Sequence, residues 1–312
     1  MANSMTPVAQ WRYRPSGAGG VVTVSGREYP TDYSERIVEL LVARKGVARM
    51  PRYLRYRSER AGKLEPLFTH LEKLGRPVSV LEPGCSAGHL SEAILSHACV
   101  SRLVSFDPDE GMIEVCREKK RHFGFDRWEV ACATSPAFTS ETFDVVLMSA
   151  MMEHVDPRLR ATLVRECYDR LEPGGKLVVL ESQNRHWPFE YHVIRLPIPF
   201  AHYLPARWIW RLCRAFGRYD ASWSFEEFAN PNTGWWGTTL AELRAPGIRV
   251  REVTDDYGYG PRRYLDEWKK QGVIGRVKIG VFSVCAAVAR LLGVSPTGLL
   301  PAIYVVYEKE AS

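Results

Sequence analysis

Residues 78–92, which read VSVLEPGCSAGHLSE, constrain the fold of this chain more than any other stretch. An apolar run meets an acid, Glu82, and then two glycines four positions apart, Gly84 and Gly88, before a helix-like segment. Period and composition predict a buried parallel strand, a tight loop and the start of a helix. Open α/β sheets hold nucleotide-like ligands at this position.

The spacing within the loop indicates the class of ligand. A dinucleotide fingerprint, G-x-G-x-x-G, would place glycines where this chain has Ser86 and His89. Glu82 at the strand end would repel a phosphate but suits a cationic ligand. The loop therefore argues against a dinucleotide and favours a positively charged nucleoside.

Strand and helix signals alternate from this point onward, which predicts an α/β sheet with helices on both faces. Residues 1–33, rich in Gly, Ser and Pro, are expected to be a flexible lead. One domain is expected over 34–312. Its parts are N-terminal helices (34–76), a cofactor-binding core (77–181), an aromatic lid (182–237) and C-terminal strands (238–312) with an insertion at 258–300. The expected strands are 78–82, 102–107, 128–131, 143–149, 176–181, 248–254 and 302–308, and the expected later helices are 88–97, 109–121, 157–171 and 238–244.

Charge and cysteine usage exclude some classes. The chain has 312 residues, a net charge of +6 and seven cysteines, an odd number with no C-x-x-C pair. A disulfide framework and a zinc site are both disfavoured, no metal site is expected, and a reducing cytoplasm is the simpler location. The first twenty residues have no apolar segment of the kind found in signal peptides.

Four motifs in order resemble a class I S-adenosylmethionine-dependent methyltransferase of the UbiE-like, or type 11, kind. They are VLEPGCSAG, SFDPDEGMIE, FDVVLMSAMMEHVDP and LEPGGKLVVLE, and they cover roughly residues 78–181. The resemblance implies a Rossmann-like sheet of seven strands whose last strand, 302–308, is antiparallel. It also implies S-adenosylmethionine as cofactor, a ligand that has a sulfonium, an ammonium and a carboxylate but no phosphate.

The resemblance assigns the donor-binding residues. Glu82 would hold the cationic methionine end directly or through water, and Asp107 would take both ribose hydroxyls. The middle glycine of the family loop is Ser86 here, and the usual Asp–Ala at the third strand end is Cys132–Ala133, which removes one carboxylate contact to adenine. The full set implied for the cofactor is Glu82, Gly84, Cys85, Ser86, Gly88, Asp107, Pro108, Met112, Cys132, Ala133, Ser149 and Ala150.

The segment ESQNRHWPFEYH after the fifth core strand offers the acid–base groups. We expect His192 or His186 to act as a base, with Glu190 orienting it or binding the acceptor. His154 is expected to be structural. Six of the nine tryptophans lie in 187–236, which favours a lid over a hydrophobic acceptor.

The expected activity is methyl transfer to a small-molecule or lipid-like acceptor, with oxygen favoured over nitrogen or carbon. One alternative is an RNA methyltransferase, since residues 44–63 hold eight cations and one acid, although a solvated helix face is the commoner meaning. Another is a non-catalytic S-adenosylmethionine-binding protein. No membrane span is expected. Residues 273–292 could contact a membrane surface, although a buried helix is favoured, and the oligomeric state stays open.

Overall fold

A computed structural model describes residues 10–54, 56–218 and 223–310 of the chain. The chain divides into two compact units, Met1–Thr134 and Ser135–Ser312, which are described in turn. The boundary falls inside the segment 77–181 expected to form the cofactor-binding core.

The first unit opens with a three-stranded antiparallel sheet, so the expectation of a flexible lead is wrong for residues 11–31. Residues 1–9 of that lead lie outside the described residues. The turn between the second and third strands has positive φ at both central residues, Ser25 (49°) and Gly26 (79°), as a two-residue hairpin requires. Gly20 packs under the Tyr13 ring, where a Cβ would come within 2.3 Å of the ring. The strands are β1 (Trp11–Ser16), β2 (Gly19–Val24) and β3 (Arg27–Thr31).

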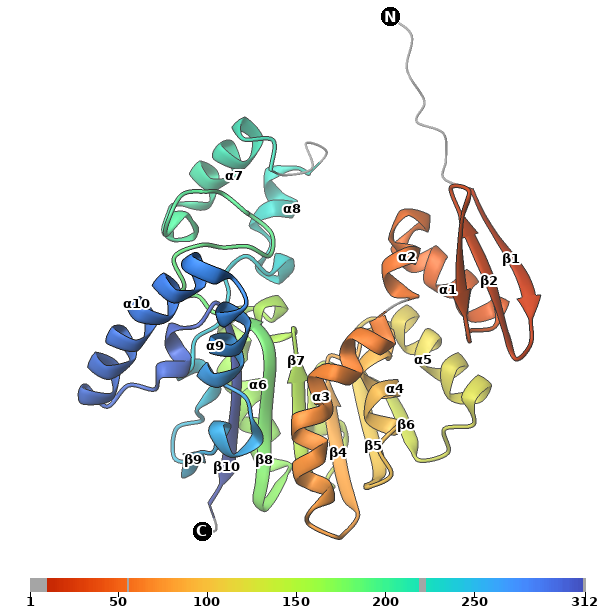
Figure 1. Ribbon diagram of the computed structural model, residues 1–312. Helices are drawn as coiled ribbons and strands as arrows, with labels where there is room; N and C mark the ends of the chain where they lie inside the picture. Colours follow the sequence, from red (N-terminus) through yellow and green to blue (C-terminus); the bar gives the residue numbers. More distant parts are fainter. Residues whose placement is uncertain (1–9, 55, 219–222, 311–312) are drawn as a thin grey trace, which may run out of the picture. The chain divides into compact units, whose positions relative to one another are not determined.

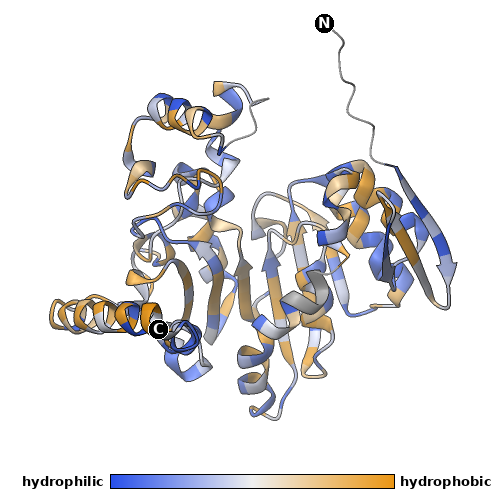
Figure 2. Ribbon diagram, turned by 45° about the horizontal axis from the view of Figure 1, so that its top comes forward, coloured by the Kyte–Doolittle hydropathy of each residue, from blue (hydrophilic) through white to orange (hydrophobic). Residues whose placement is uncertain are grey.

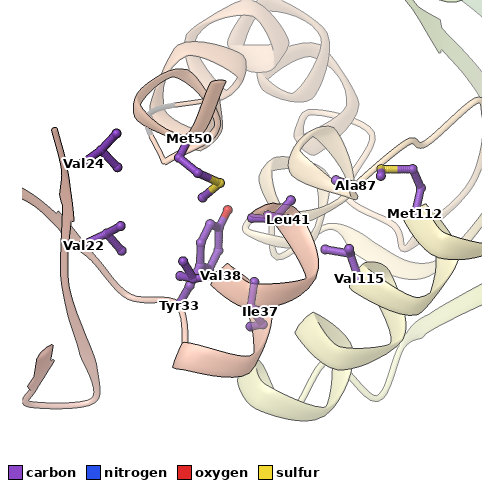
Figure 3. Close-up of a cluster of buried hydrophobic side chains, with 10 residues drawn as sticks. All are labelled: Val22, Val24, Tyr33, Ile37, Val38, Leu41, Met50, Ala87, Met112 and Val115. Atoms are coloured by element: carbon purple, nitrogen blue, oxygen red, sulfur yellow. The ribbon is translucent and has the colours of Figure 1, made fainter. Parts of the chain in front are cut away.

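Helices follow, as expected for residues 34–76, and the first of them ends at Gly46. They are α1 (Glu35–Lys45), α2 (Met50–Tyr53) and α3 (Tyr56–Glu72). A hydrophobic cluster joins this region to the loop after the next strand and to the helix Glu110–Phe123 (Figure 3). Its buried members are Val22, Val24, Tyr33, Ile37, Val38, Leu41, Met50, Ala87, Met112 and Val115.

The rest of the first unit alternates strands and helices close to the predicted ranges (Figure 1). Neighbouring strands pair in parallel, as the βαβ connections require. The elements are β4 (Val78–Pro83), α4 (His89–Leu95), β5 (Val100–Asp107), α5 (Glu110–Phe123) and β6 (Trp128–Cys132).

In the second unit, β7 and β8 pair in parallel, and β10 pairs antiparallel with β8 on one side and β9 on the other. The predicted helix 238–244 is wrong, because Thr238 forms a bridge to Asn184 and only a 3-10 turn follows, at Ala241–Leu243. The strands are β7 (Phe143–Ser149), β8 (Leu171–Gln183), β9 (Val250–Glu252) and β10 (Ala302–Lys309). The helices are α6 (Pro157–Asp169), α7 (Ala206–Ala215), α8 (Phe225–Ala229), α9 (Pro261–Lys269) and α10 (Gly272–Leu291).

The strand order β6-β5-β4-β7-β8-β10-β9 gives the seven-stranded sheet that the sequence predicts. The prediction that the last strand is antiparallel is confirmed, since β10 runs against β8. The carboxyl ends of β4 and β5 carry the motifs read as donor-binding, which is where such sheets hold ligands.

A buried ion pair holds α4 and α5 of the first unit together. Lys119 contacts Glu92, and both side chains are fully buried. The Tyr33 hydroxyl donates to Glu92 Oε1 at 3.1 Å, and Lys119 Nζ donates to the Tyr33 hydroxyl at 3.2 Å. Since Tyr33 lies between β3 and α1, these bonds connect the N-terminal sheet region to the α/β core.

We predict that Lys119→Met lowers the free energy of unfolding by about 3–5 kcal/mol, because it leaves the Glu92 carboxylate buried without its cation. Urea unfolding measures the change. The double variant Glu92→Met/Lys119→Met should lose less than the single one. Arg102→Met is the matched control, because its pair with Glu129 is 36% and 55% exposed and should cost less than about 1 kcal/mol. Equal losses for Lys119→Met and Arg102→Met would contradict this account.

Candidate functional site

The loop between β4 and α4 keeps the glycine-like backbone that a close ligand approach requires. Gly84, Ser86 and Gly88 have φ values of 70°, 48° and 73°. Ser86 therefore adopts the left-handed conformation of the glycine it replaces, which is uncommon for a side-chain-bearing residue. The N–H groups of Gly84 and Cys85 both donate to the Phe106 carbonyl, at 2.8 and 3.1 Å.

Gly88 is required by packing as well as by its backbone angle. A Cβ there would lie 2.6 Å from the Trp128 ring and 3.0 Å from Cys116 Sγ. Trp128 is fully buried, so it has no room to yield. Gly88 thus sets how closely the start of α4 approaches Trp128 of β6.

Glu82 lies beneath this loop and is only 1% exposed. Its Oε2 accepts hydrogen bonds from Ser91 Oγ at 2.5 Å and Ser105 Oγ at 2.7 Å. Burial raises the pKa of Glu82 to about 7, a shift that these two hydroxyls reduce in part. Glu82 was expected to hold the cationic methionine end either directly or through water, and its burial favours contact through water.

Asp107 ends β5 and organises the same loop. Its Oδ2 accepts from the Ser86 N–H at 2.9 Å, and its Oδ1 accepts from the Asp109 N–H at 2.9 Å. Each carboxylate oxygen has a second acceptor site, so the half-buried group can still bind hydroxyls.

The residues expected around the adenine differ in burial. Pro108 and Cys132 are exposed, and the Cys132 thiol lies 3.6 Å from the Pro108 carbonyl. The Ala133 N–H donates to the Asp107 carbonyl at 3.2 Å. Met112 is 2% exposed and packs beside Ala87 in the hydrophobic cluster of Figure 3. Met112 therefore packs in the hydrophobic cluster that includes Ala87 of the donor loop.

In the second unit, Ser149 is the last residue of β7 and Ala150 follows it. Ala150 has a φ of 47°, and its N–H donates to the Leu180 carbonyl at 2.9 Å. This strained residue turns the chain into a 3-10 turn that carries Glu153 and His154. A short, fixed turn at a strand end is a typical place for reactive side chains.

Glu153, His154 and His192 form a cluster that sequence reasoning did not assemble. Each offers one oxygen or nitrogen, and these three atoms lie within 4.8 Å of one another, close enough to hold a metal ion. The imidazoles of His154 and His192 meet edge to face, with centroids 5.2 Å apart. Burial raises the pKa of Glu153. The adjacent pair Glu153–His154 just after a strand was the available signal.

A turn of the chain fixes the His154 ring. His154 Nδ1 lies 3.0 Å from the Asn232 carbonyl, which can only accept, so Nδ1 carries a proton. Gly234 packs against the ring so closely that a Cβ would come within 2.6 Å of it. In neutral His154 the lone pair is therefore on Nε2.

Glu190 differs from its expected role as partner of a histidine ring. Its buried carboxylate accepts from four backbone N–H groups, those of His192, Val193, Ile194 and Arg195. It positions the loop that carries His192 and has no acceptor left for an imidazole. His192 is exposed and joins the cluster above, whereas His186 is exposed outside that cluster.

The aromatic segment 182–237 forms mainly a small core of its own. Trp235 is fully buried and stacks on Trp236, with centroids 3.8 Å apart. Phe228 also stacks on Trp235, with ring centroids 5.2 Å apart. Trp208 is 64% exposed. Residues 219–222 of the expected lid lie outside the described residues.

Comparison with known proteins agrees with this arrangement. Residues 81–179 match a family model described as "Methyltransferase domain". This segment is an S-adenosylmethionine-dependent methyltransferase domain. The predicted family and cofactor are therefore confirmed for the matched residues.

Relatives of the methyltransferase domain include the mitochondrial "Ubiquinone biosynthesis O-methyltransferase" of Saccharomyces cerevisiae, 32% identical over 124 residues, or 39% of this chain and 38% of that protein. The protein of the same name from Coxiella burnetii is 27% identical, over 43% of this chain and 60% of its own. The "Trans-aconitate 2-methyltransferase" of Rhizobium meliloti is 27% identical, over 44% and 50%. The chain thus matches less than two thirds of the length of these relatives.

Among solved structures, the N-methyltransferase NodS from Bradyrhizobium japonicum, in complex with S-adenosyl-L-homocysteine, covers 64% of this chain and 76% of its own. It has 19% identity and a TM-score of 0.37. TehB from Haemophilus influenzae covers 43% and 44%, with 17% identity and a TM-score of 0.34.

We predict a distinctive pH dependence for the methyltransferase domain, caused by Glu82. Because its pKa in the folded state is about 7, above the ordinary 4.5, the folded chain holds a proton that the unfolded chain releases between these values. Stability should therefore fall as pH rises from about 4.5 to about 7, by roughly 3 kcal/mol in total.

Glu82→Gln should flatten this part of the profile, because the amide does not titrate. Urea unfolding at a series of pH values measures it, with Glu129→Gln as an exposed control that should leave the slope as in the parent. An unchanged slope in Glu82→Gln would show that Glu82 is not the responsible group.

Proposed function

We propose that the chain transfers a methyl group from S-adenosylmethionine to a small-molecule or lipid-like acceptor, with oxygen as the favoured atom. The observation that carries the proposal is the donor loop, in which three alternate residues are left-handed above a buried carboxylate, with Asp107 at the next strand end. Two of the relatives above are named as O-methyltransferases of ubiquinone biosynthesis, which favours oxygen. A cytoplasmic location stays a prediction from the cysteine content.

On the donor side, Asp107 is the residue proposed to accept the ribose hydroxyls. Its two oxygens are already held by the N–H groups of Ser86 and Asp109, so the carboxylate needs little reorganisation on binding. With Cys132 in place of an acid, the adenine end has one charged contact fewer, and backbone groups near Ala133 are proposed to hold it.

S-adenosylmethionine supplies an activated methyl group when bound, so the protein mainly aligns the acceptor and removes its proton. We assign proton removal to His192, with His154 as its neighbour. A hydroxyl acceptor of high pKa gains from such a base. His154, held by Asn232 and Gly234, provides a fixed edge against which the His192 ring rests. Glu190 contributes by holding the backbone of the His192 loop.

The nucleic-acid alternative receives less support from the basic stretch 44–63. Arg44 pairs with Asp109 at 3.6 Å, and Lys45 lies 5.9 Å above the Tyr53 ring, so part of the positive charge is used inside the unit. Residue 55 of the stretch lies outside the described residues. A shift assay with RNA at low salt distinguishes the alternatives, and salt-sensitive binding there would favour the RNA methyltransferase.

We predict that Asp107→Asn and His192→Gln affect different steps. Asp107→Asn should weaken S-adenosylmethionine binding by about tenfold or more, since a charged acceptor becomes neutral. His192→Gln should leave binding within about twofold and lower turnover by about a hundredfold or more. Calorimetric titration measures donor binding. Transfer of a labelled methyl group into a lipid extract measures turnover, and mass spectrometry of the product identifies the methylated atom.

His186→Gln is the matched control, because His186 is an exposed histidine of the same segment outside the cluster. Absence of heat with both S-adenosylmethionine and S-adenosylhomocysteine would refute donor binding. Donor binding without methyl transfer to any extract would favour the non-catalytic alternative. Loss of turnover on adding EDTA, with His192→Gln already inactive, would instead indicate that the cluster acts through a metal ion.

A further inference from the structure

Helix α10 has two apolar faces, and the described part of the chain covers only one of them. The buried residues lie on one side of the helix, at Gly275 and then seven, eleven and fourteen positions later, at Phe282, Ala286 and Ala289. Phe282 meets Trp268 of α9 edge to face, with centroids 5.8 Å apart, and Leu300 belongs to the same cluster. This face fixes α10 against α9 and the segment that leads into β10.

The opposite face is a stripe of large aliphatic side chains in contact with solvent. Val277, Val281 and Val284 are 62%, 61% and 66% exposed, and Leu291 is 87% exposed. Figure 2 shows α10 as hydrophobic along most of its length. We define the α10 stripe as Val273, Val277, Val281, Val284, Val288 and Leu291, all at least half exposed.

Such a stripe is costly in water. Burying a Val or Leu side chain is favourable, and contiguous exposed apolar surface of this kind marks an interaction site. Valine is also a poorer helix former than alanine or leucine, so intrinsic propensity does not explain its use here. The expectation from the sequence that 273–292 is a buried helix is thus wrong for this face.

We propose that α10 docks in the plane of an anionic lipid bilayer, with the α10 stripe inserted into the headgroup boundary. The charges favour this occupant. Between Glu267 and Glu308 the sequence has no acidic residue, whereas it has five basic ones: Lys269, Lys270, Arg276, Lys278 and Arg290. Basic residues beside an apolar helix face are typical of helices that lie on anionic lipid.

By length and composition, α10 could also cross a membrane. Two observations favour the in-plane orientation. A spanning helix would carry its two ends to opposite sides of a hydrocarbon core about 30 Å thick. Here the chain before α10 and the chain after it pack on the same face of the helix, through Trp268 and Leu300. Phe282 and Ala286, near the middle of the helix, are buried against these residues rather than available to lipid.

The test is sedimentation of the full chain with vesicles of phosphatidylcholine alone and of phosphatidylcholine mixed with phosphatidylglycerol. We expect binding to the mixed vesicles that weakens as salt is raised. The stripe variant Val281→Gln/Val284→Gln should lower binding by more than about tenfold, because two inserted side chains become polar. The charge variant Arg276→Gln/Lys278→Gln/Arg290→Gln should lose the preference for the anionic vesicles.

Ser283→Gln/Ala287→Gln is the matched control, since both residues are exposed on α10 outside the stripe. It should bind like the parent, and circular dichroism should show all variants folded. Parental binding by the stripe variant would overturn the proposal. So would a parent that ignores vesicles but is a dimer that the stripe variant converts to monomer, because a second copy would then cover the stripe. Resistance of bound parent to alkaline extraction would indicate a spanning helix instead. None of these readouts depends on methyl transfer.

Discussion

The buried carboxylate of Glu82 is the interaction on which the α/β core depends. A carboxylate in an apolar interior is unfavourable unless donors surround it, and here Ser91 of α4 and Ser105 of β5 provide them. Ser105 in turn accepts from the Trp128 indole at 3.0 Å, which adds β6 to the network. One acid at a strand end therefore holds a helix and two further strands in register, and it lies directly below the donor loop.

The loop itself is shaped by what surrounds it rather than by the ligand. Position 88 is a glycine because Trp128 leaves no space for a side chain there, and Ser86 is held in a left-handed conformation with its N–H bonded to Asp107. The same aspartate is the proposed ribose acceptor. Because its contacts already orient it, binding can exploit a carboxylate whose conformational entropy has been lost during folding. Stability of the loop and affinity for the donor are thus linked through one side chain.

Apolar runs and turn residues along the sequence predicted the core strands and the helices of the α/β core. Strands β4 to β8 and β10, and helices α4, α5 and α6, have apolar runs and turn residues that do not depend on distant partners. The N-terminal sheet was missed because Gly19 and Gly20 look like flexible linker residues, whereas Gly20 is there to admit the Tyr13 ring from another strand. Glu190 was misread for a similar reason. Its residue type suits catalysis, but its four acceptor contacts are all to backbone N–H groups of the next residues, a local geometry that composition does not reveal.

The acceptor side illustrates why sequence alone stopped short. His154 and His192 are thirty-eight positions apart in the printed sequence, and only the return of the chain after β8 brings their rings together. The aromatic segment was expected to cover an acceptor, yet Trp235 is buried in a small core of that segment, stacked on Trp236 and Phe228. Exposed apolar side chains of the second unit include Phe200, Trp208 and Phe216 of this segment and the stripe on α10. An acceptor that is itself apolar would meet that surface at a membrane, so the exposed helix and a lipid-like acceptor are consistent with one another on physical grounds.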